Sequence, residues 1–325
     1  MHTAKVIVRR SHALVAALVA LLSVIAAGCG ASDVAVPELT SFTNVAQTSS
    51  AADSASFSLA AEVKVPGIGK KLEVSADGGF DTPTKRSKMS VDLSSLAELM
   101  KSFGSGMGGT VTGDLGSPED WKLEVIQDGD TAYVHFPPLA KQLPDGKTWV
   151  KGDAKTLSAA GSGEMQQFGS LAGTDPRDVF GMLRAVSGSI EAVGTDELRG
   201  VETSHYKATI DTAKVEKLLP AQQQKALGRI GRSGRSLIPI DVWIDADQRI
   251  RKLAIDLAAI ESEPPTTSPS SASGAGTPLS ILGASGSIDI EGSVVFEVYD
   301  YGKALDLELP PADQVADAAT LKRPS

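Results

Sequence analysis

Side chains that could support catalysis or metal binding are few in this chain. Its 325 residues include one cysteine and four histidines, and His2 and His12 lie close to the N-terminus. His135 and His205 remain, each in a run of alternating apolar residues and without a second histidine at metal-binding spacing. One cysteine excludes a disulfide within the chain and a metal site built from thiolates. We therefore expect both histidines to be structural or surface residues.

Three motifs that resemble nucleotide or calcium sites fail on their context. Residues 104–109 match GxGxxG, but a helical pattern precedes them where a dinucleotide site needs a strand. Residues 146–148 resemble the end of a P-loop, but a strand pattern follows instead of a helix. Asp241, Asp245 and Asp247 lack the EF-hand spacing, and we interpret them as exposed turn carboxylates. We therefore predict no catalytic residue, no metal site, no cofactor and no enzymatic activity.

The single cysteine follows a segment that resembles a bacterial lipoprotein signal. A basic start precedes an apolar run over 13–27, which is short for a membrane-spanning helix of about 20 residues, and Cys29 follows. In a lipoprotein signal, this cysteine becomes the acylated first residue of the mature chain. We predict a lipoprotein signal peptide over 1–28, lipid attachment at Cys29 and a lipidated tether over 29–36. The alternative is an ordinary secretory signal with a chance cysteine, since Ala26 stands where leucine is commonest.

Charge limits the partners of the mature chain. The full sequence has 31 Lys and Arg against 40 Asp and Glu, and removal of residues 1–28 takes away three basic residues and no acidic one, which changes the net charge from −9 to −12. A protein this acidic lacks the basic surface that nucleic acid binding requires. Anionic lipids repel it as well, so its contact with the membrane should come from the acyl anchor alone. We expect the protein to be a monomer at the extracytoplasmic face of the cell membrane.

Period-two alternation of apolar residues dominates the remainder of the chain and predicts more strands than helices. Turn-length connections such as Asp128–Gly129 and Arg199–Gly200 join most of the strands, which favours antiparallel pairing. We predict an α+β fold with one large curved antiparallel sheet and helices over its concave face. The strand patterns on either side of the polar tract 261–280 indicate neighbouring strands joined by a long loop.

These patterns predict one domain over 37–316, followed by a C-terminal tail over 317–325. Two flexible insertions are expected within the domain, a glycine-rich one at about 104–118 and the polar tract at about 261–280.

Three segments of the chain resemble actinobacterial envelope lipoproteins of the LppX/LprAFG type. They are residues 194–211 (GTDELRGVETSHYKATID), residues 242–252, and the ending formed by 299–302 and LPPAD at 309–313. The resemblance implies a half-barrel similar to that of the LolA/LolB lipoprotein carriers. It also implies a hydrophobic cavity that binds acylated lipid or glycolipid for transport across the cell envelope, with a membrane transporter as a candidate partner. These motifs are strand-and-turn patterns, so they indicate fold more than activity.

The inward strand positions are mainly small aliphatic residues, which leave space and offer few hydrogen-bonding partners, as acyl chains require. We predict that the cavity is lined by Phe57, Leu59, Val63, Leu123, Val125, Val134 and Phe296. Composition alone favours a packed core instead. In that case the protein would be a surface-tethered interaction or sensor module that regulates a membrane partner.

Overall fold

A computed structural model of the chain describes residues 39–64, 71–104, 116–141, 143–153, 155–157, 177–211, 214–215, 217, 237–257 and 291–321. These residues belong to one compact unit, Val36–Ser325. Cys29 lies outside the described residues, as do the predicted signal peptide and tether. The polar tract 261–280 and most of the glycine-rich insertion lie outside them too.

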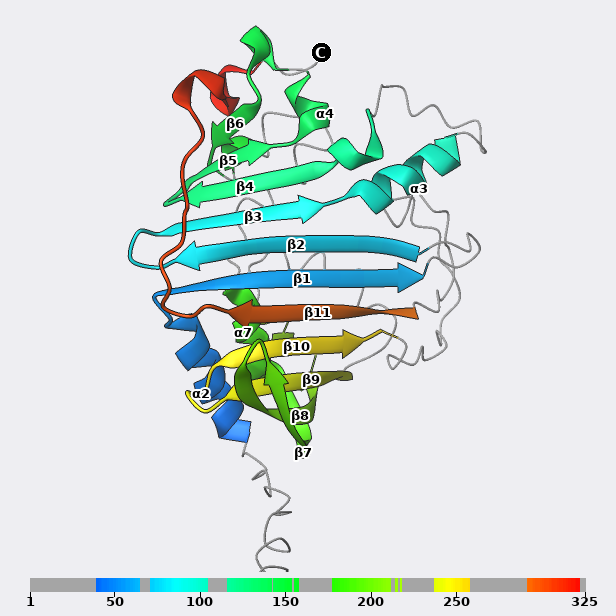
Figure 1. Cartoon of the computed structure of the whole chain (residues 1–325), viewed down its shortest axis with the longest axis vertical. Helices are drawn as coiled ribbons and strands as arrows, with labels where there is room; N and C mark the ends of the chain where they lie inside the picture. Colours follow the sequence, from blue (N-terminus) through cyan, green and yellow to red (C-terminus); the bar gives the residue numbers. More distant parts are fainter. Residues whose placement is uncertain are drawn as a thin grey trace, which may run out of the picture. The chain divides into compact units, whose positions relative to one another are not determined.

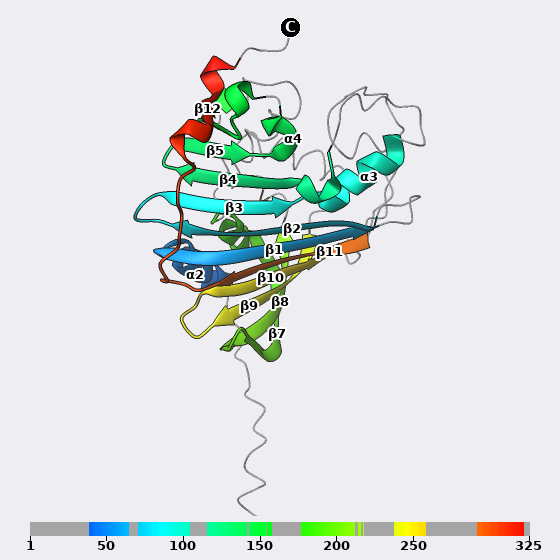
Figure 2. The ribbon, with the colours of Figure 1, turned by 45° about the horizontal axis from the view of Figure 1, so that its top comes forward.

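The described strands are β1 (Ser54–Lys64), β2 (Lys71–Asp81), β3 (Arg86–Asp92), β4 (Lys122–Asp128), β5 (Thr131–His135), β6 (Trp149–Gly152), β7 (Val186–Leu198), β8 (Val201–Asp211), β9 (Leu237–Asp245), β10 (Ile250–Asp256), β11 (Glu291–Tyr299) and β12 (Val315–Asp317). They form one open sheet in the order β12-β6-β5-β4-β3-β2-β1-β11-β10-β9-β8-β7 (Figure 1). Among these strands, only β12 runs parallel to its neighbour. Figure 2 shows the sheet curving toward β7. The predicted fold class, a large curved antiparallel sheet with few helices, is confirmed.

Local turns and one distant pairing set the strand order. Arg199 and Gly200 join β7 to β8 with φ angles of 51° and 78°, a left-handed geometry that glycine adopts without strain. β11 pairs with β10, which confirms that the strands on either side of the polar tract are neighbours. The other edge of β11 pairs with β1, so the last long strand joins the two halves of the sheet.

The helices of the described residues are α2 (Leu39–Ser50), α3 (Ser94–Gly104), α4 (Pro137–Ala140) and α7 (Asp178–Gly181), with 3-10 turns η1 (Pro118–Asp120), η2 (Pro144–Gly146), η3 (Met182–Ala185), η5 (Ala312–Gln314) and η6 (Ala318–Thr320). The face of the sheet that α2 and α7 cover is the inner face. Phe42 of α2 packs edge-on against Tyr206 of β8, with ring centroids 6.1 Å apart, and Phe180 of α7 packs against Phe296 of β11. None of the described helices combines the length and apolarity that a membrane crossing needs.

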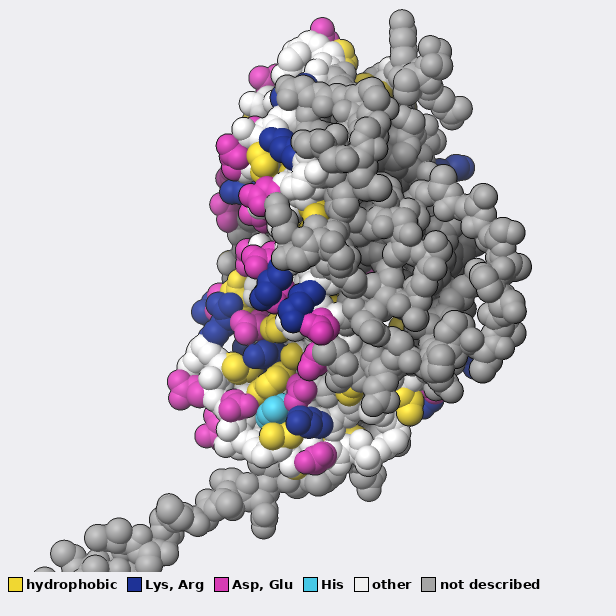
Figure 3. Space-filling view, turned by 90° about the vertical axis from the view of Figure 1, so that its right-hand side faces the viewer, with side chains coloured by type: hydrophobic (Ala, Val, Ile, Leu, Met, Phe, Trp, Pro, Cys, Tyr) yellow, Lys and Arg dark blue, Asp and Glu magenta, His cyan; other side chains and the backbone are white. Residues whose placement is uncertain are grey.

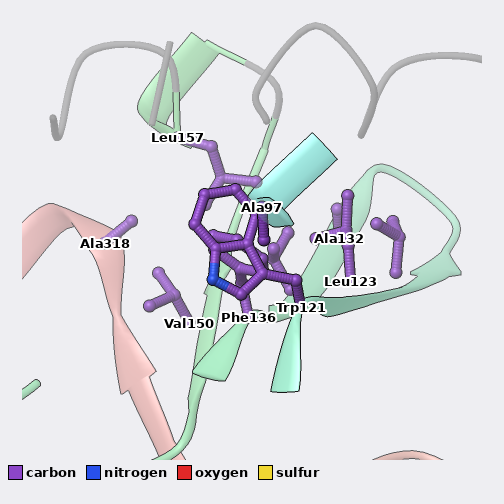
Figure 4. Packing of buried hydrophobic residues seen from close by; sticks show 10 residues of the cluster. Ala97, Trp121, Leu123, Ala132, Phe136, Val150, Leu157 and Ala318 are labelled. Carbon is purple, nitrogen blue, oxygen red and sulfur yellow. The ribbon is translucent and has the colours of Figure 1, made fainter. Parts of the chain in front are cut away.

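A packed cluster fills the inner face over β4, β5 and β6 (Figure 4). Trp121 and Phe136 meet edge-on at 5.5 Å between centroids, and α3 adds Ala97 above them. Leu157 and Ala318 complete the cluster, both almost fully buried. Because η6 supplies Ala318, the folded domain extends beyond residue 316, into the first residues of the segment that we expected to be a C-terminal tail.

The segment after β11 holds the strand ends together on its way to β12 (Figure 1). The backbone N–H of Gly302 donates to the carbonyl of Ser54 at the start of β1, and the Ser54 hydroxyl donates to the carbonyl of Lys303. Further on, the N–H of Thr148 donates to the carbonyl of Gln314 next to β6. The segment therefore connects the centre of the sheet with its β6 edge.

Gly78 on β2 is required for the position of Phe57 on β1. A Cβ atom at Gly78 would overlap the Phe57 ring and the backbone carbonyl of Lys88. We expect Gly78→Ala to lower the free energy of unfolding by about 1–3 kcal/mol, as overpacking does. Gly181→Ala is the matched control, because nothing lies within 4 Å of a Cβ atom there. Urea denaturation checks the difference, and equal stabilities of the two variants would contradict this packing.

Candidate functional site

All seven predicted lining residues lie on the inner face, as the strand register shows. Directly paired residues of antiparallel strands point to the same side of a sheet. Across the strands, the register pairs Leu59 with Phe296 and, through Gly78 and Met89, aligns Phe57 with Val125 and Val134. Val63 and Leu123 share the same face by alternation along β1 and β4.

The structure divides these seven residues between different surroundings. Leu123, Val125 and Val134 belong to the packed cluster with Trp121, and each is 1–6% exposed. Phe57 and Phe296 are also buried, but they lie in the centre of the sheet. Leu59 and Val63 are half-buried. The seven residues thus share a sheet face, but five of them are buried and two are half-buried.

Four phenylalanines cross the middle of the inner face and are here called the phenylalanine wall: Phe57, Phe80, Phe180 and Phe296. Ring centroids lie 5.7 Å apart for Phe57 and Phe296, 6.3 Å for Phe180 and Phe296, and 6.4 Å for Phe80 and Phe180. Three strands and α7 supply the rings, and all four side chains are buried. Mutual contact in edge-on and tilted geometry stabilises such a group beyond its burial alone.

Beyond the phenylalanine wall, toward the end of β1, lies an aliphatic surface here called the aliphatic floor: Ala61, Val63, Leu72, Val74, Ile255 and Val294. Ala61 pairs with Val74 on one side and with Val294 on the other, and Val294 pairs with Ile255. All six residues are half-buried, whereas Ala76 and Leu253, one pair closer to the wall on the same face, are 6% and 9% exposed. None of the six side chains can donate or accept a hydrogen bond.

Sequence reasoning identified only Val63 of the aliphatic floor. The alternation of Ala61 with Val63, and of Leu72 with Val74, does indicate that these residues share a face with Leu59. No local pattern indicates that they are half-buried, because burial depends on what packs over the strand. On the buried parts of the same face, Phe42 of α2, Phe180 of α7 and Ala97 of α3 belong to the core.

The opposite side of the sheet is here called the outer face. In the side view of Figure 3, basic, acidic and hydrophobic side chains are interspersed among the described residues. His205 lies on the outer face, in β8. Its Nε2 atom is 2.6 Å from Asp241 Oδ1, and its ring stacks on Trp243 with centroids 4.1 Å apart. Trp243 Nε1 donates to Asp196 at 2.7 Å. These mutual contacts give His205 a structural role, consistent with the prediction that it is a structural or surface residue.

His135 lies on the same outer face, at the other end of the sheet. Its ring packs against Trp149 at 5.2 Å between centroids. Burial lowers the pKa of His135, and the nearby Glu124 carboxylate opposes the shift. Among the described residues, no group of three or more His, Cys, Asp or Glu side chains could hold a metal ion.

The interpretation of Asp241 and Asp245 as exposed turn carboxylates is wrong. Asp241 lies within β9, is only partly exposed and contacts His205. Asp245 is 5% exposed, and its Oδ2 atom accepts a hydrogen bond from Arg251 Nε at 2.6 Å. Next to this pair, Ser49 of α2 accepts a hydrogen bond from the N–H of Ile250. Burial raises the pKa of Tyr301 above its usual range, so its hydroxyl stays protonated and donates to the Ile250 carbonyl. These contacts attach the end of α2 to the sheet.

Loss of the Arg251 guanidinium should therefore strongly destabilise the fold. We expect Arg251→Met to lower the free energy of unfolding by about 3–5 kcal/mol, because the buried Asp245 charge loses its partner. Arg86→Met is the matched control, since the Arg86–Asp128 ion pair is much more exposed than the Arg251–Asp245 pair and ion pairs in contact with solvent contribute little. Thermal and urea denaturation of both variants check the contrast. Similar losses in the two variants would contradict this account of Asp245.

No protein-family model matches the chain. A curated relative, an uncharacterized 31.2 kDa protein from the rplA-rplJ intergenic region of Streptomyces griseus, is 26% identical over 129 residues. The match covers 38% of this chain and 42% of that protein, so the chain spans less than half the length of the relative.

Several solved structures are similar to the chain over most of its length. Lipoprotein LppX of Mycobacterium tuberculosis is 16% identical, with a TM-score of 0.41 over 83% of this chain and 97% of that one. LprF of Mycobacterium bovis is 14% identical, with a TM-score of 0.42 over 85% and 99%. A LolA superfamily protein of Nitrosomonas europaea is 7% identical, with a TM-score of 0.26 over 81% and 94%. The solved structures that are similar to this chain thus include LppX and a LolA superfamily protein, the types of protein that the sequence resembles.

Proposed function

We propose that the protein is an envelope lipoprotein that binds the acyl chains of a lipid or glycolipid on the aliphatic floor. The observation that supports this most strongly is the change in burial along one sheet face. Next to the phenylalanine wall Ala76 and Leu253 are buried, and beyond them the six adjacent aliphatic side chains of the floor are only half-buried. A partly exposed apolar surface next to a packed core is a common feature of binding sites for apolar ligands.

The chemistry of the aliphatic floor favours an acyl chain over a polar ligand. Its six side chains carry no charge and no hydrogen-bonding atom, so they would leave the polar groups of a sugar or nucleotide unpaired. A methylene group that leaves water for such a surface contributes about 0.8 kcal/mol. Transfer from a bilayer to the protein exchanges one apolar environment for another, so it needs only a small free-energy change and no catalytic residue.

The proposed location is the extracytoplasmic face of the cell membrane, with acylated Cys29 as the anchor. Two or more acyl chains hold a protein at a bilayer far more firmly than one. The mature charge of −12 would keep the folded unit away from anionic lipids. In this arrangement the protein could pass lipid to or from a membrane transporter, and assist transport across the envelope.

Lipid extraction from the purified protein tests the proposal. The full chain is expressed in a host that processes lipoproteins, purified and extracted with organic solvent, and the extract is analysed by mass spectrometry. We expect a non-covalently bound acyl lipid at close to one molecule per chain. The proposal would be contradicted if the extract contains no lipid and the protein also binds no fluorescent acyl probe. Crosslinking to a single membrane protein in that case would favour the alternative, a tethered interaction or sensor module.

A further inference from the structure

Building on the proposed function, we infer that the phenylalanine wall limits how far an acyl chain enters and thereby selects its length. Along β1, the inner-face positions are Phe57, Leu59, Ala61 and Val63 in turn. Leu59 pairs with Phe296, so the wall reaches across β11 at the point where the aliphatic floor begins. An acyl chain that enters at the Val63 end and lies along these strands would end against the phenylalanine rings.

The contacts within the wall make it a firm boundary. Phe180 is fully buried and contacts both Phe80 and Phe296, so it joins β2 to β11 from above the sheet. The Phe57 ring lies directly over Gly78, where any side chain would overlap it. An acyl chain could pass only by displacing packed rings, and interiors at this density resist such displacement.

The apolar strip along β1 has a length that can be compared with a ligand. It consists of Leu59 next to the wall and of Ala61 and Val63 on the aliphatic floor. From Leu59 to Val63 the strand rises by about 13 Å at 3.3 Å per residue. Beyond that length, additional methylene groups cannot be buried against the floor and would remain in water. Each methylene that does gain burial raises affinity about fourfold, which corresponds to about 0.8 kcal/mol. Affinity should therefore rise with chain length up to a limit set by the wall.

Competition among fatty acids of different length tests this inference. The full-length protein is incubated with an equimolar mixture of saturated fatty acids of increasing chain length, and the bound fraction of each is measured by mass spectrometry. Phe296→Leu opens the wall, and we expect the preferred length to increase, with enrichment of about fourfold for each additional methylene that becomes buried. Phe136→Leu is the matched control, since it removes a buried ring from the separate packed cluster.

A second variant tests the limit on acyl-chain length and leaves the phenylalanine wall intact. Val294→Phe places a ring on the aliphatic floor, directly opposite Ala61, and should shift the preference to shorter chains. If the wild type binds the fatty acids but both variants keep its preferred length, the role of the wall is refuted and the proposed function stands. If the wild type binds none of them, the proposed function itself fails.

Discussion

Ala61→Trp is expected to reduce the lipid that co-purifies with the protein at least tenfold. Ala61 lies in the middle of the aliphatic floor, paired with Val74 and Val294, and is half-buried. An indole there would occupy the space over the floor that an acyl chain needs, because two groups cannot fill the same volume. The measurement is mass spectrometry of the solvent extract, with the lipid signal normalised to protein.

Ala60→Trp is the matched control for this experiment. Ala60 has the same side chain and the adjacent position on β1, but it points to the outer face and is exposed. We expect this variant to retain the lipid content of the wild type. Circular dichroism shows whether both variants keep their strands. Equal lipid loss in both, or in neither, would contradict a binding surface on the inner face.

Cys29→Ala is expected to abolish incorporation of labelled palmitate into the protein. The prediction follows from the lipoprotein-like signal, in which the thiol of Cys29 is the only thiol in the chain available for acylation. Loss of the acyl chains removes about 0.8 kcal/mol of membrane binding for every methylene that was buried. The measurement is metabolic labelling of the full chain in a host that processes lipoproteins, followed by electrophoresis.

Gly30→Ala serves as the control, since it changes the neighbouring residue and leaves the thiol in place. This variant should incorporate label at the level of the wild type. Intact mass measurement of the wild type adds a second readout, with the mass expected for a chain that begins at acylated Cys29. A wild type without label would favour the ordinary secretory signal.

The sequence was sufficient to predict the sheet because its strongest signals are local. Alternation identified most of the strands, and Asp128–Gly129 and Arg199–Gly200 marked hairpins that the structure contains. The pairing of β1 with β11 lies beyond such reasoning, because these strands are separated by more than two hundred residues and share no turn. Asp245 was misjudged because its position between two strands looked like an exposed turn. The neighbouring Ile250 is held by Ser49 and Tyr301, which are distant in sequence, so no local pattern indicates how deeply this turn is buried.

The candidate site was harder to predict than the sheet. Val63 and Val134 have the same residue type and the same inner face, and the sequence predicted both as lining residues. The structure distinguishes them, because Val134 is buried in the packed cluster below α3 while Val63 remains half-buried. The two residues differ in how much of the chain packs over them, and no strand pattern specifies this.

Photolabelling with an acyl lipid tests the central claim most directly. A phospholipid with a photoreactive diazirine on its acyl chain is added to the full-length protein, and the mixture is irradiated. The modified peptides are then located by mass spectrometry. The account predicts adducts on the inner-face residues of β1, β2, β10 and β11, at Val63, Leu72, Val74, Ile255 or Val294, and competition by unlabelled lipid. Adducts confined to the outer face, or labelling that unlabelled lipid does not reduce, would contradict it.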